Sequence, residues 1–176
     1  DLKPANILVG KDGQPKVLDF GLAKTLEAEG DVRISIEGEV AGTPAFMSPE
    51  QASGHHDQVG ARSDVYTLGV ILYVLATGKY HHDMSGTHFE ILKRIVDNEP
   101  RRPSQLGVKV DAELETILLK ALARKAANRY ASAALLASDL ERYLKGDPLL
   151  AHGPSATYVL KRKVHKHRVP LMVIAG

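Results

Sequence analysis

The sequence contains no cysteine. This absence excludes a disulfide framework and a zinc site built from thiolates, and it is compatible with a reducing compartment. The chain also has almost no excess of positive charge: it contains 23 lysines and arginines and 21 aspartates and glutamates, a formal net charge of +2. This excess is too small for a positively charged nucleic-acid-binding surface over the whole protein, so we expect no nucleic-acid partner.

Long hydrophobic runs are missing from the middle of the chain. The apolar stretch at residues 68–76 is well short of the roughly 20 residues that cross a bilayer. It predicts a core helix, buried on most sides, that Ser63 caps and Gly78 ends. With 44% hydrophobic residues among 176, the chain can bury one ordinary core.

Two short runs near the start predict a β-hairpin. Residues 7–9 and 16–18 are β-prone, and the segment 10–15 between them contains two glycines and a proline. Residues 19–50 then show no sustained periodicity, which indicates a long loop. Loops of that length usually carry function.

Three amphipathic helices are predicted further along, because a capping residue precedes each apolar stripe. Thr87 precedes a helix that ends before Pro100. Asp111 caps the second helix, and Ser132 caps the third, which stops at Gly146. The residues expected to face the core repeat at helical spacing. They are Leu114, Ile117, Leu118, Ala121 and Leu122 in the second helix, and Leu136, Leu140, Tyr143 and Leu144 in the third.

Three motifs in a fixed order carry the chemistry of the sequence. The hexapeptide DLKPAN occupies residues 1–6, DFG occupies residues 19–21, and residues 42–50 end in Ser-Pro-Glu. In this order they resemble the catalytic loop, the metal-binding motif and the substrate-docking segment of serine/threonine protein kinases. Any one of these residues alone would be an ordinary turn or surface residue, so the resemblance depends on the whole set and its spacing.

The resemblance implies roles for five residues. Asp1 would accept the proton of the substrate hydroxyl, and Lys3 would neutralise charge on the phosphate that ATP transfers. Asn6 and Asp19 supply the hard oxygen ligands that Mg²⁺ prefers, so both are expected at the metal and, with Lys3, at the nucleotide. Thr43 would bond to Asp1 and Lys3 and complete the catalytic set. The implied cofactors are ATP and Mg²⁺, and the implied substrate is a protein serine or threonine.

Other positions match structural and regulatory residues of the same family. Glu50 and Arg129 are expected to form a buried bidentate pair that anchors the docking segment. Asp64 resembles the aspartate that holds the backbone before the catalytic aspartate. Ser35 lies where regulatory phosphorylation occurs in these kinases, and a phosphate there would add about −1.5 to −2 charges.

The implied fold is the mainly α-helical C-terminal lobe of the two-lobed kinase fold, with a short β-hairpin, over residues 1–146. In this family a Gly-rich loop, a strand lysine and a helix glutamate precede the catalytic aspartate. No residue precedes Asp1 here, so we expect an N-terminally truncated kinase that is inactive as an isolated chain. The alternative is a non-catalytic, pseudokinase-like module that binds proteins, against which the complete catalytic set argues.

The composition changes after Gly146. We expect residues 147–168 to be a basic juxtamembrane linker and residues 169–176 to be the start of a truncated transmembrane helix. The kinase lobe would then lie at the cytoplasmic face of the plasma membrane, in a single-pass protein whose basic tail binds anionic lipid. The alternatives are an apolar tail packed on the lobe and a peripheral membrane protein. The five cations of the tail are Lys161, Arg162, Lys163, Lys166 and Arg168.

Eight histidines include the adjacent pairs at 55–56 and 81–82. Adjacent side chains rarely converge on one ion, and no carboxylate stands at helical spacing from either pair to complete a metal motif. We therefore interpret these histidines as loop residues and expect no metal site built from them.

Overall fold

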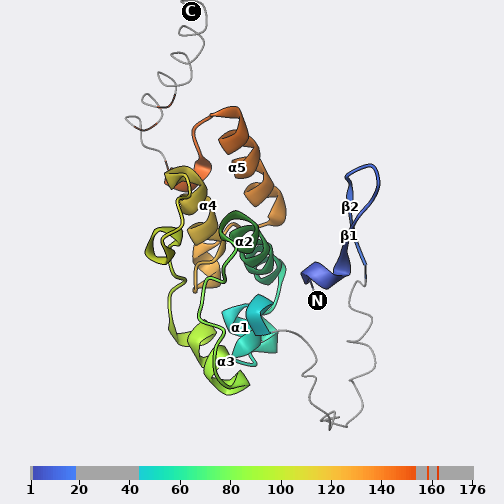
Figure 1. Ribbon diagram of the computed structural model, residues 1–176, viewed down its shortest axis with the longest axis vertical. Coiled ribbons are helices and arrows are strands. Elements are labelled where there is room, and N and C mark those ends of the chain that lie inside the picture. The colour runs from blue at the N-terminus through green and yellow to red at the C-terminus, as the bar shows by residue number, and fades with distance from the viewer. Residues whose placement is uncertain (1, 19–43, 154–157, 159–161, 163–176) are drawn as a thin grey trace, which may run out of the picture.

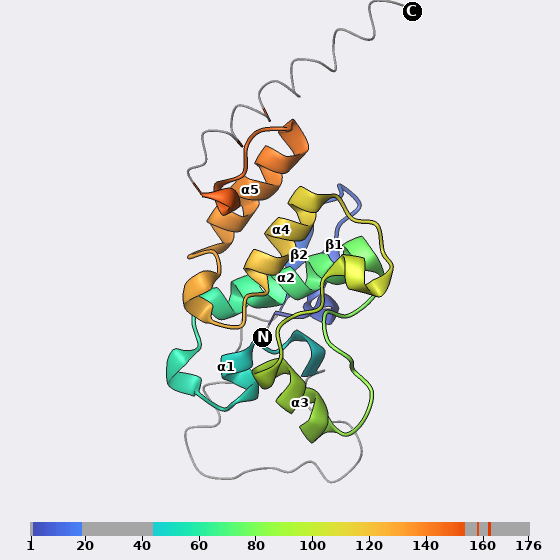
Figure 2. The same ribbon diagram turned by 90° about the vertical axis from the view of Figure 1, so that its left-hand side faces the viewer.

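The computed structural model describes residues 2–18 and 44–153, together with residues 158 and 162. Helix α2 (Ala61–Thr77) runs through the middle of the helical part. Helices α4 (Ala112–Ala121) and α5 (Ala133–Lys145) lie on one side of it, and α1 (Pro49–Ala52) and α3 (His88–Asp97) lie toward the other (Figures 1 and 2). This arrangement confirms the mainly helical fold expected for a kinase C-terminal lobe.

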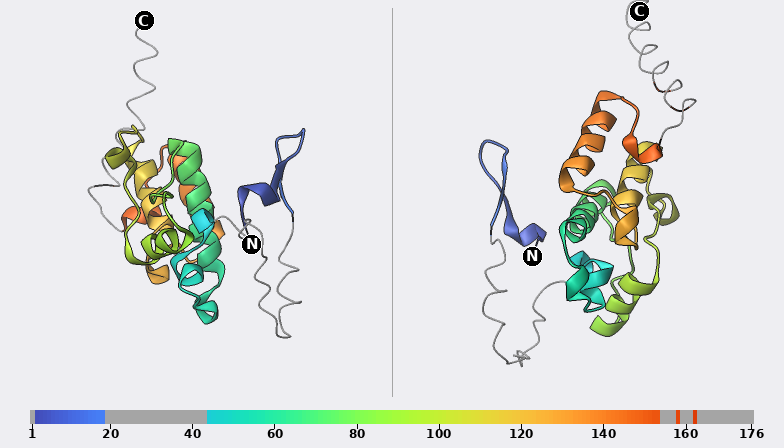
Figure 3. Two further views of the ribbon diagram at one scale, coloured as in Figure 1. Left: turned by 60° about the horizontal axis from the view of Figure 1, so that its bottom comes forward. Right: turned by 180° about the vertical axis from the view of Figure 1, so that it is seen from behind.

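The predicted hairpin is present near the N-terminus. Strand β1 (Ile7–Val9) pairs antiparallel with β2 (Pro15–Val17), and Ile7 lies opposite Val17. The turn contains Gly13 at a φ of 75°, which glycine adopts without a steric penalty. Figure 3 shows the hairpin to one side of the helices, and its apolar side chains Leu8 and Val9 are exposed.

Helix α2 begins earlier than the sequence predicted. Gly60, not Ser63, is the N-cap residue, so the expected cap was wrong. Ser63 is the third helical residue, and its Oγ accepts a hydrogen bond from the Gly60 amide at 3.1 Å. The other end agrees with the prediction, because Gly78 closes the helix in the left-handed region at a φ of 68°.

The core forms where α2 packs against α4 and α5. At Gly69, α2 and α4 approach so closely that an added Cβ would lie 2.9 Å from the Cβ of Ala121. One buried cluster contains Val65, Ile117, Ala121, Tyr130, Leu136 and Leu149, and the other contains Tyr66, Val70, Tyr73, Leu118 and Leu122. Burying this apolar surface supplies the main free energy that favours folding.

The three predicted amphipathic helices are all capped as expected. Thr87 accepts a hydrogen bond from the Glu90 amide, Asp111 from the Glu113 amide, and Ser132 from the Leu135 amide. Most of the predicted core stripes are buried or partly buried. Leu144 is an exception, since 81% of it is exposed on the outer side of α5.

Packing on the lobe continues beyond α5. Leu149 is buried in the core, and the buried carboxylate of Asp139 accepts hydrogen bonds from the amides of Leu150 at 2.7 Å and Ala151 at 2.8 Å. The proposed boundary at residue 146 and the two tail segments remain predictions. Within the described residues, no helix is both long enough and apolar enough to cross a membrane.

Candidate functional site

Two of the five predicted site residues lie in the described part of the chain. Lys3 precedes a 3-10 turn at Pro4–Asn6, and the Asn6 amide donates to the Lys3 carbonyl at 2.9 Å. The Asn6 carbonyl accepts from the amide of Leu18 at 2.7 Å, so the hairpin brings the end of the DLKPAN motif beside the residue that precedes DFG. Asp1, Asp19 and Thr43 lie outside the described residues, as does Ser35, and their roles stay predictions.

The described part of the docking segment (residues 42–50) begins with a 3-10 turn at Pro44–Phe46 and continues into α1. The carbonyl of Phe46 accepts a hydrogen bond from Thr67 Oγ1 of α2 at 3.0 Å. The amide of buried Ser48 donates to the Gln51 side chain at 3.0 Å, which holds the first turn of α1. These contacts fix the segment against the central helix.

Glu50 and Arg129 meet as the sequence predicted. The two guanidinium nitrogens Nη1 and Nη2 donate to Oε1 and Oε2 of Glu50 at 2.7 and 2.8 Å, and both side chains are buried. Ser63 Oγ donates to Glu50 Oε1 at 2.6 Å. Burial raises the pKa of the Glu50 carboxyl, but the hydrogen bonds from Arg129 and Ser63 outweigh it and lower the pKa to about 2.

Arg129 also connects α1 to α2 and to the segment that follows α4. Its Nε donates to the Ala123 carbonyl at 2.7 Å, and its two Nη atoms donate to the carbonyls of Arg62 and Arg124. The guanidinium carbon lies 4.8 Å from the centre of the Tyr66 ring, a cation–π distance. A fully bonded arginine is required here because a buried cation without partners is strongly unfavourable.

Other predicted positions have less evidence. Asp64 is exposed on the first turn of α2, and its expected contact with the catalytic loop remains a prediction. His81 and His82 follow α2 in a loop, as expected, but the structure buries both of them. Sequence pattern missed this burial, because a histidine in a turn-rich segment has no local signal that separates a covered loop from an exposed one. Among the described residues, no group of three histidines, aspartates or glutamates could hold a metal ion.

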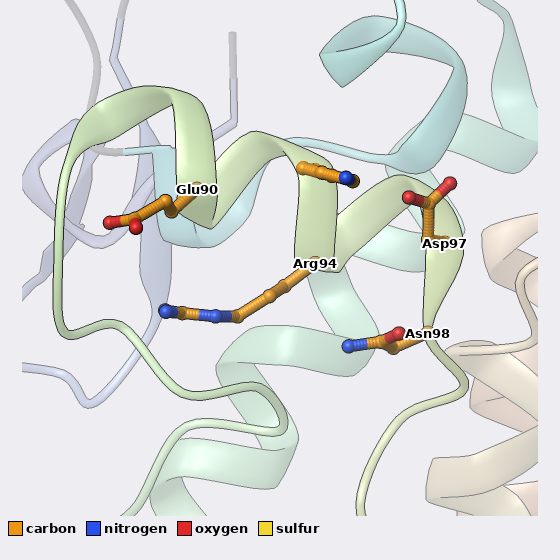
Figure 4. Close-up of a pocket in the computed structure, with 5 residues that line it drawn as sticks. Glu90, Arg94, Asp97 and Asn98 are labelled. Atoms are coloured by element: carbon orange, nitrogen blue, oxygen red, sulfur yellow. The ribbon is translucent and has the colours of Figure 1, made fainter.

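A shallow pocket lies on the polar side of α3 (Figure 4). Two of the side chains that line it form hydrogen bonds with the backbone at the start of α3 and in the loop before it. Glu90 accepts from the Thr87 amide at 2.8 Å, and Arg94 donates to the carbonyls of Asp83 and Ser85. The pocket is lined by Glu90, Lys93, Arg94, Asp97 and Asn98. Its side chains stabilise the loop before α3 and contain none of the predicted catalytic residues.

Comparison with known proteins decides the family. The model of the protein kinase domain matches residues 1–140. The chain belongs to the protein kinase family. It is 40% identical over 146 residues to serine/threonine-protein kinase PknB of Mycolicibacterium smegmatis, and 38% identical over 148 residues to PknB of Mycobacterium tuberculosis. A probable serine/threonine-protein kinase of Streptomyces coelicolor, SCO3848, is 37% identical over 149 residues.

These alignments include most of this kinase chain but a small part of its relatives. They cover 83 to 85% of the chain, and only 22 to 23% of each relative. The chain therefore spans less than a quarter of the length of these curated serine/threonine kinases.

Proposed function

We propose that this chain is part of a serine/threonine protein kinase that transfers the γ-phosphoryl group of ATP to protein hydroxyls. The observation that carries the proposal is the hydrogen bond from the Leu18 amide to the Asn6 carbonyl, which holds the end of the DLKPAN motif beside the residue that precedes DFG. The buried pair of Glu50 and Arg129 supports it, because it anchors the segment expected to receive the substrate.

In this proposal each catalytic residue has one task. Asp1 orients the substrate hydroxyl and accepts its proton, while Lys3 places a cation on the moving phosphate. Asn6 and Asp19 are the residues that would hold Mg²⁺, since an amide and a carboxylate offer the oxygen donors that this ion prefers. Mg²⁺ would supply charge neutralisation for the phosphates of ATP. Thr43 would align Asp1 and Lys3 for a serine or threonine substrate.

We further propose a membrane location for the whole protein. Five cations between Lys161 and Arg168 would lie against anionic lipid at the cytoplasmic face, and residues 169–176 would enter the bilayer. What supports this is the sequence pattern alone, because residues 163–176 lie outside the described part of the chain.

The enzymatic proposal is tested on a completed kinase domain. The chain is joined to the upstream half of the kinase domain of a similar protein, and phosphoryl transfer from ATP to a protein substrate is measured. Asp1→Asn should lower turnover by about 10² to 10⁴-fold, because it removes the proton acceptor but keeps the shape. Asp12→Asn, in the exposed hairpin turn, is the matched control and should leave turnover unchanged.

The outcomes separate the alternatives. Full turnover by Asp1→Asn would reject the catalytic role of Asp1. A completed domain that folds and binds ATP without turnover would favour a non-catalytic binding module. The 176-residue chain by itself should show no turnover, because nothing in it would hold the α and β phosphates.

A further inference from the structure

Two adjacent histidines are buried in the loop between α2 and α3. His81 is 0% exposed and His82 is 4% exposed, and their ring centres lie 4.4 Å apart. The His81 ring packs edge-on against Tyr66 and Tyr73 of α2, at centre distances of 5.5 and 6.1 Å. An imidazole that changes its charge near neutral pH is an unusual choice for a site without solvent.

The polar contacts of His81 fit a neutral ring. Its Nε2 lies 2.7 Å from the Tyr66 hydroxyl, and its carbonyl accepts from the Arg101 amide at 2.8 Å. The Tyr73 hydroxyl donates to the Arg101 carbonyl at 2.8 Å. Within the described residues, His81 Nδ1 and Arg101 Nε are buried without a hydrogen-bond partner. A second proton on His81 would therefore sit on a buried nitrogen that has no hydrogen-bond acceptor among the described residues.

Tyr66 connects this histidine to the anchor of the docking segment. Its hydroxyl contacts His81, and the face of its ring lies against the guanidinium of Arg129, which holds Glu50 in α1. The charged groups around the cluster are the cations Arg101 and Arg129 and the carboxylates of Glu50, Asp83, Glu99 and Glu115. Since Glu50 is already paired with Arg129, it offers little compensation to a new cation on His81.

We propose that His81, with His82, Tyr66 and Arg129, forms an acid-sensitive latch that holds residues 44–53 against α2. Neutral histidines keep the latch closed, and protonation of the pair opens it and loosens the docking segment. The inference rests on the proposed function only because that function makes residues 44–50 part of a substrate-docking segment. Its test measures local opening and not phosphoryl transfer, so either proposal can fail without the other.

The direction of the pH effect follows from the site. Burial lowers the pKa of His81 well below its usual value, and repulsion from His82 and Arg101 lowers it further. Burial, with Arg101, lowers the pKa of His82 from 6.5 to about 4. Both pKa values are thus lower in the closed form than in an open form. The latch is fully stable above about pH 6.5 and loses stability from there toward pH 4.

The expected size is set by the same pKa values. Opening returns His82 from a pKa of about 4 to one of 6.5. At pH 5 the opening equilibrium should therefore rise by about 30-fold from His82 alone, and protonation of His81 acts in the same direction. The Glu50 carboxyl, with a pKa of about 2, changes its charge below this range. Its contribution falls between pH 4.5 and 2, so the two windows overlap only between about pH 4.5 and 4.

Hydrogen exchange at single amides tests the latch in the 176-residue chain. Protection factors, corrected for intrinsic exchange, are compared at pH 7.5 and pH 5. The reporters are the α1 amides of Ala52 and Ser53, bonded to the carbonyls of Ser48 and Pro49. Their protection should fall at least 10-fold more than that of the Leu136 amide in α5. In His81→Gln, which keeps a polar group near Tyr66 and cannot be protonated, this difference should become smaller, and in the double variant His81→Gln with His82→Gln most of it should disappear.

Two further measurements keep the test decisive. His152→Gln changes an exposed histidine outside residues 44–53 and should behave as wild type. NMR titration of the wild-type rings gives a result even if His81→Gln does not fold, because the latch requires both pKa values to lie well below 6.5. Ring pKa values near 6.5 would overturn the proposal. So would an equal loss of protection in α1 and α5, or a loss in α1 that His81→Gln does not reduce.

Discussion

A single arginine joins more of this lobe than any motif residue that the structure describes. Arg129 bonds both oxygens of Glu50, the carbonyl of Arg62 in α2 and the carbonyls of the adjacent residues Ala123 and Arg124, and it also lies on the Tyr66 ring. All of these groups leave water when the chain folds. Their desolvation is offset only if every donor keeps its partner, so the pair is sensitive to the loss of either member.

Glu50→Ala and Arg129→Ala should each lower the free energy of unfolding by about 3 to 5 kcal/mol, because each leaves a buried charge without its partner. Urea denaturation at pH 7 measures the change. Glu141→Ala is the control: it breaks the exposed pair of Glu141 with Lys145, at 3.4 Å, and should cost less than about 0.5 kcal/mol. If both buried variants were as stable as the control, the ion pair would not hold the lobe together.

At the scale of elements, the contact of α2 with α4 determines how tightly the core packs. Gly69 is the position of closest approach, where the missing side chain leaves room for Ala121 and Leu122. Glycine inside a helix normally costs about 1 kcal/mol relative to alanine. Here close packing outweighs helix propensity, so the glycine belongs to the helix–helix interface.

Gly69→Ala should therefore destabilise the lobe, by about 1 to 3 kcal/mol, although alanine favours helix. The measurement is thermal or urea unfolding of a double-mutant cycle with Ala121→Gly, which removes the atom 2.9 Å from the new Cβ. The double variant should recover part of the loss. Additive effects of the two substitutions, or a more stable Gly69→Ala, would show that the helices have room to separate.

Helix α5 holds the segment that follows it through the carboxylate of Asp139. This carboxylate accepts hydrogen bonds from the amides of Leu150 and Ala151 and from the hydroxyl of Tyr130. Farther along, the Tyr158 hydroxyl donates to Glu113 of α4 at 2.8 Å, and Arg162 forms an ion pair with the same carboxylate. The segment expected as a linker thus contacts the lobe at several of its described residues: Leu149, Leu150, Ala151, Tyr158 and Arg162.

At the scale of the whole molecule, the tail should bind membranes by charge. Lys161, Lys163, Lys166 and Arg168 should each contribute about 1 kcal/mol near an anionic surface, and Arg162, which forms an ion pair with Glu113, should contribute less. Salt should weaken the attraction as the Debye length shortens. Eight apolar residues cannot span a bilayer, so we expect reversible binding of this chain. Sedimentation with phosphatidylserine vesicles over a salt series measures it.

Matched variants separate the tail from the general charge of the protein. Replacing the five tail cations with glutamine should abolish the binding. Replacing three exposed lysines of the lobe with glutamine should leave vesicle binding nearly unchanged. These lysines are Lys93, Lys109 and Lys125. Binding to neutral vesicles that ignores salt, or that survives the tail replacement, would contradict the juxtamembrane interpretation and favour a tail packed on the lobe.

The sequence by itself determined the features whose signals are local. Helix ends at Thr87, Asp111 and Ser132 follow from caps that bond amides two or three residues away, and the hairpin follows from its turn. The family follows from motif order, and the pairing of Glu50 with Arg129 follows from the family. None of these conclusions needs the packing of distant segments.

Only the tertiary structure decided which residues lose contact with water. Burial of His81 against Tyr66, of Asp139 against Tyr130 and of Leu149 in the core depends on contacts that form only when the chain folds, and a loop position in the sequence does not reveal what covers it. Leu144 fits the apolar stripe of α5, yet 81% of it is exposed in the described part of the chain. Ser63 failed as a predicted cap for a related reason. Its hydroxyl donates to Glu50, a partner 13 residues away that only folding brings within 2.6 Å.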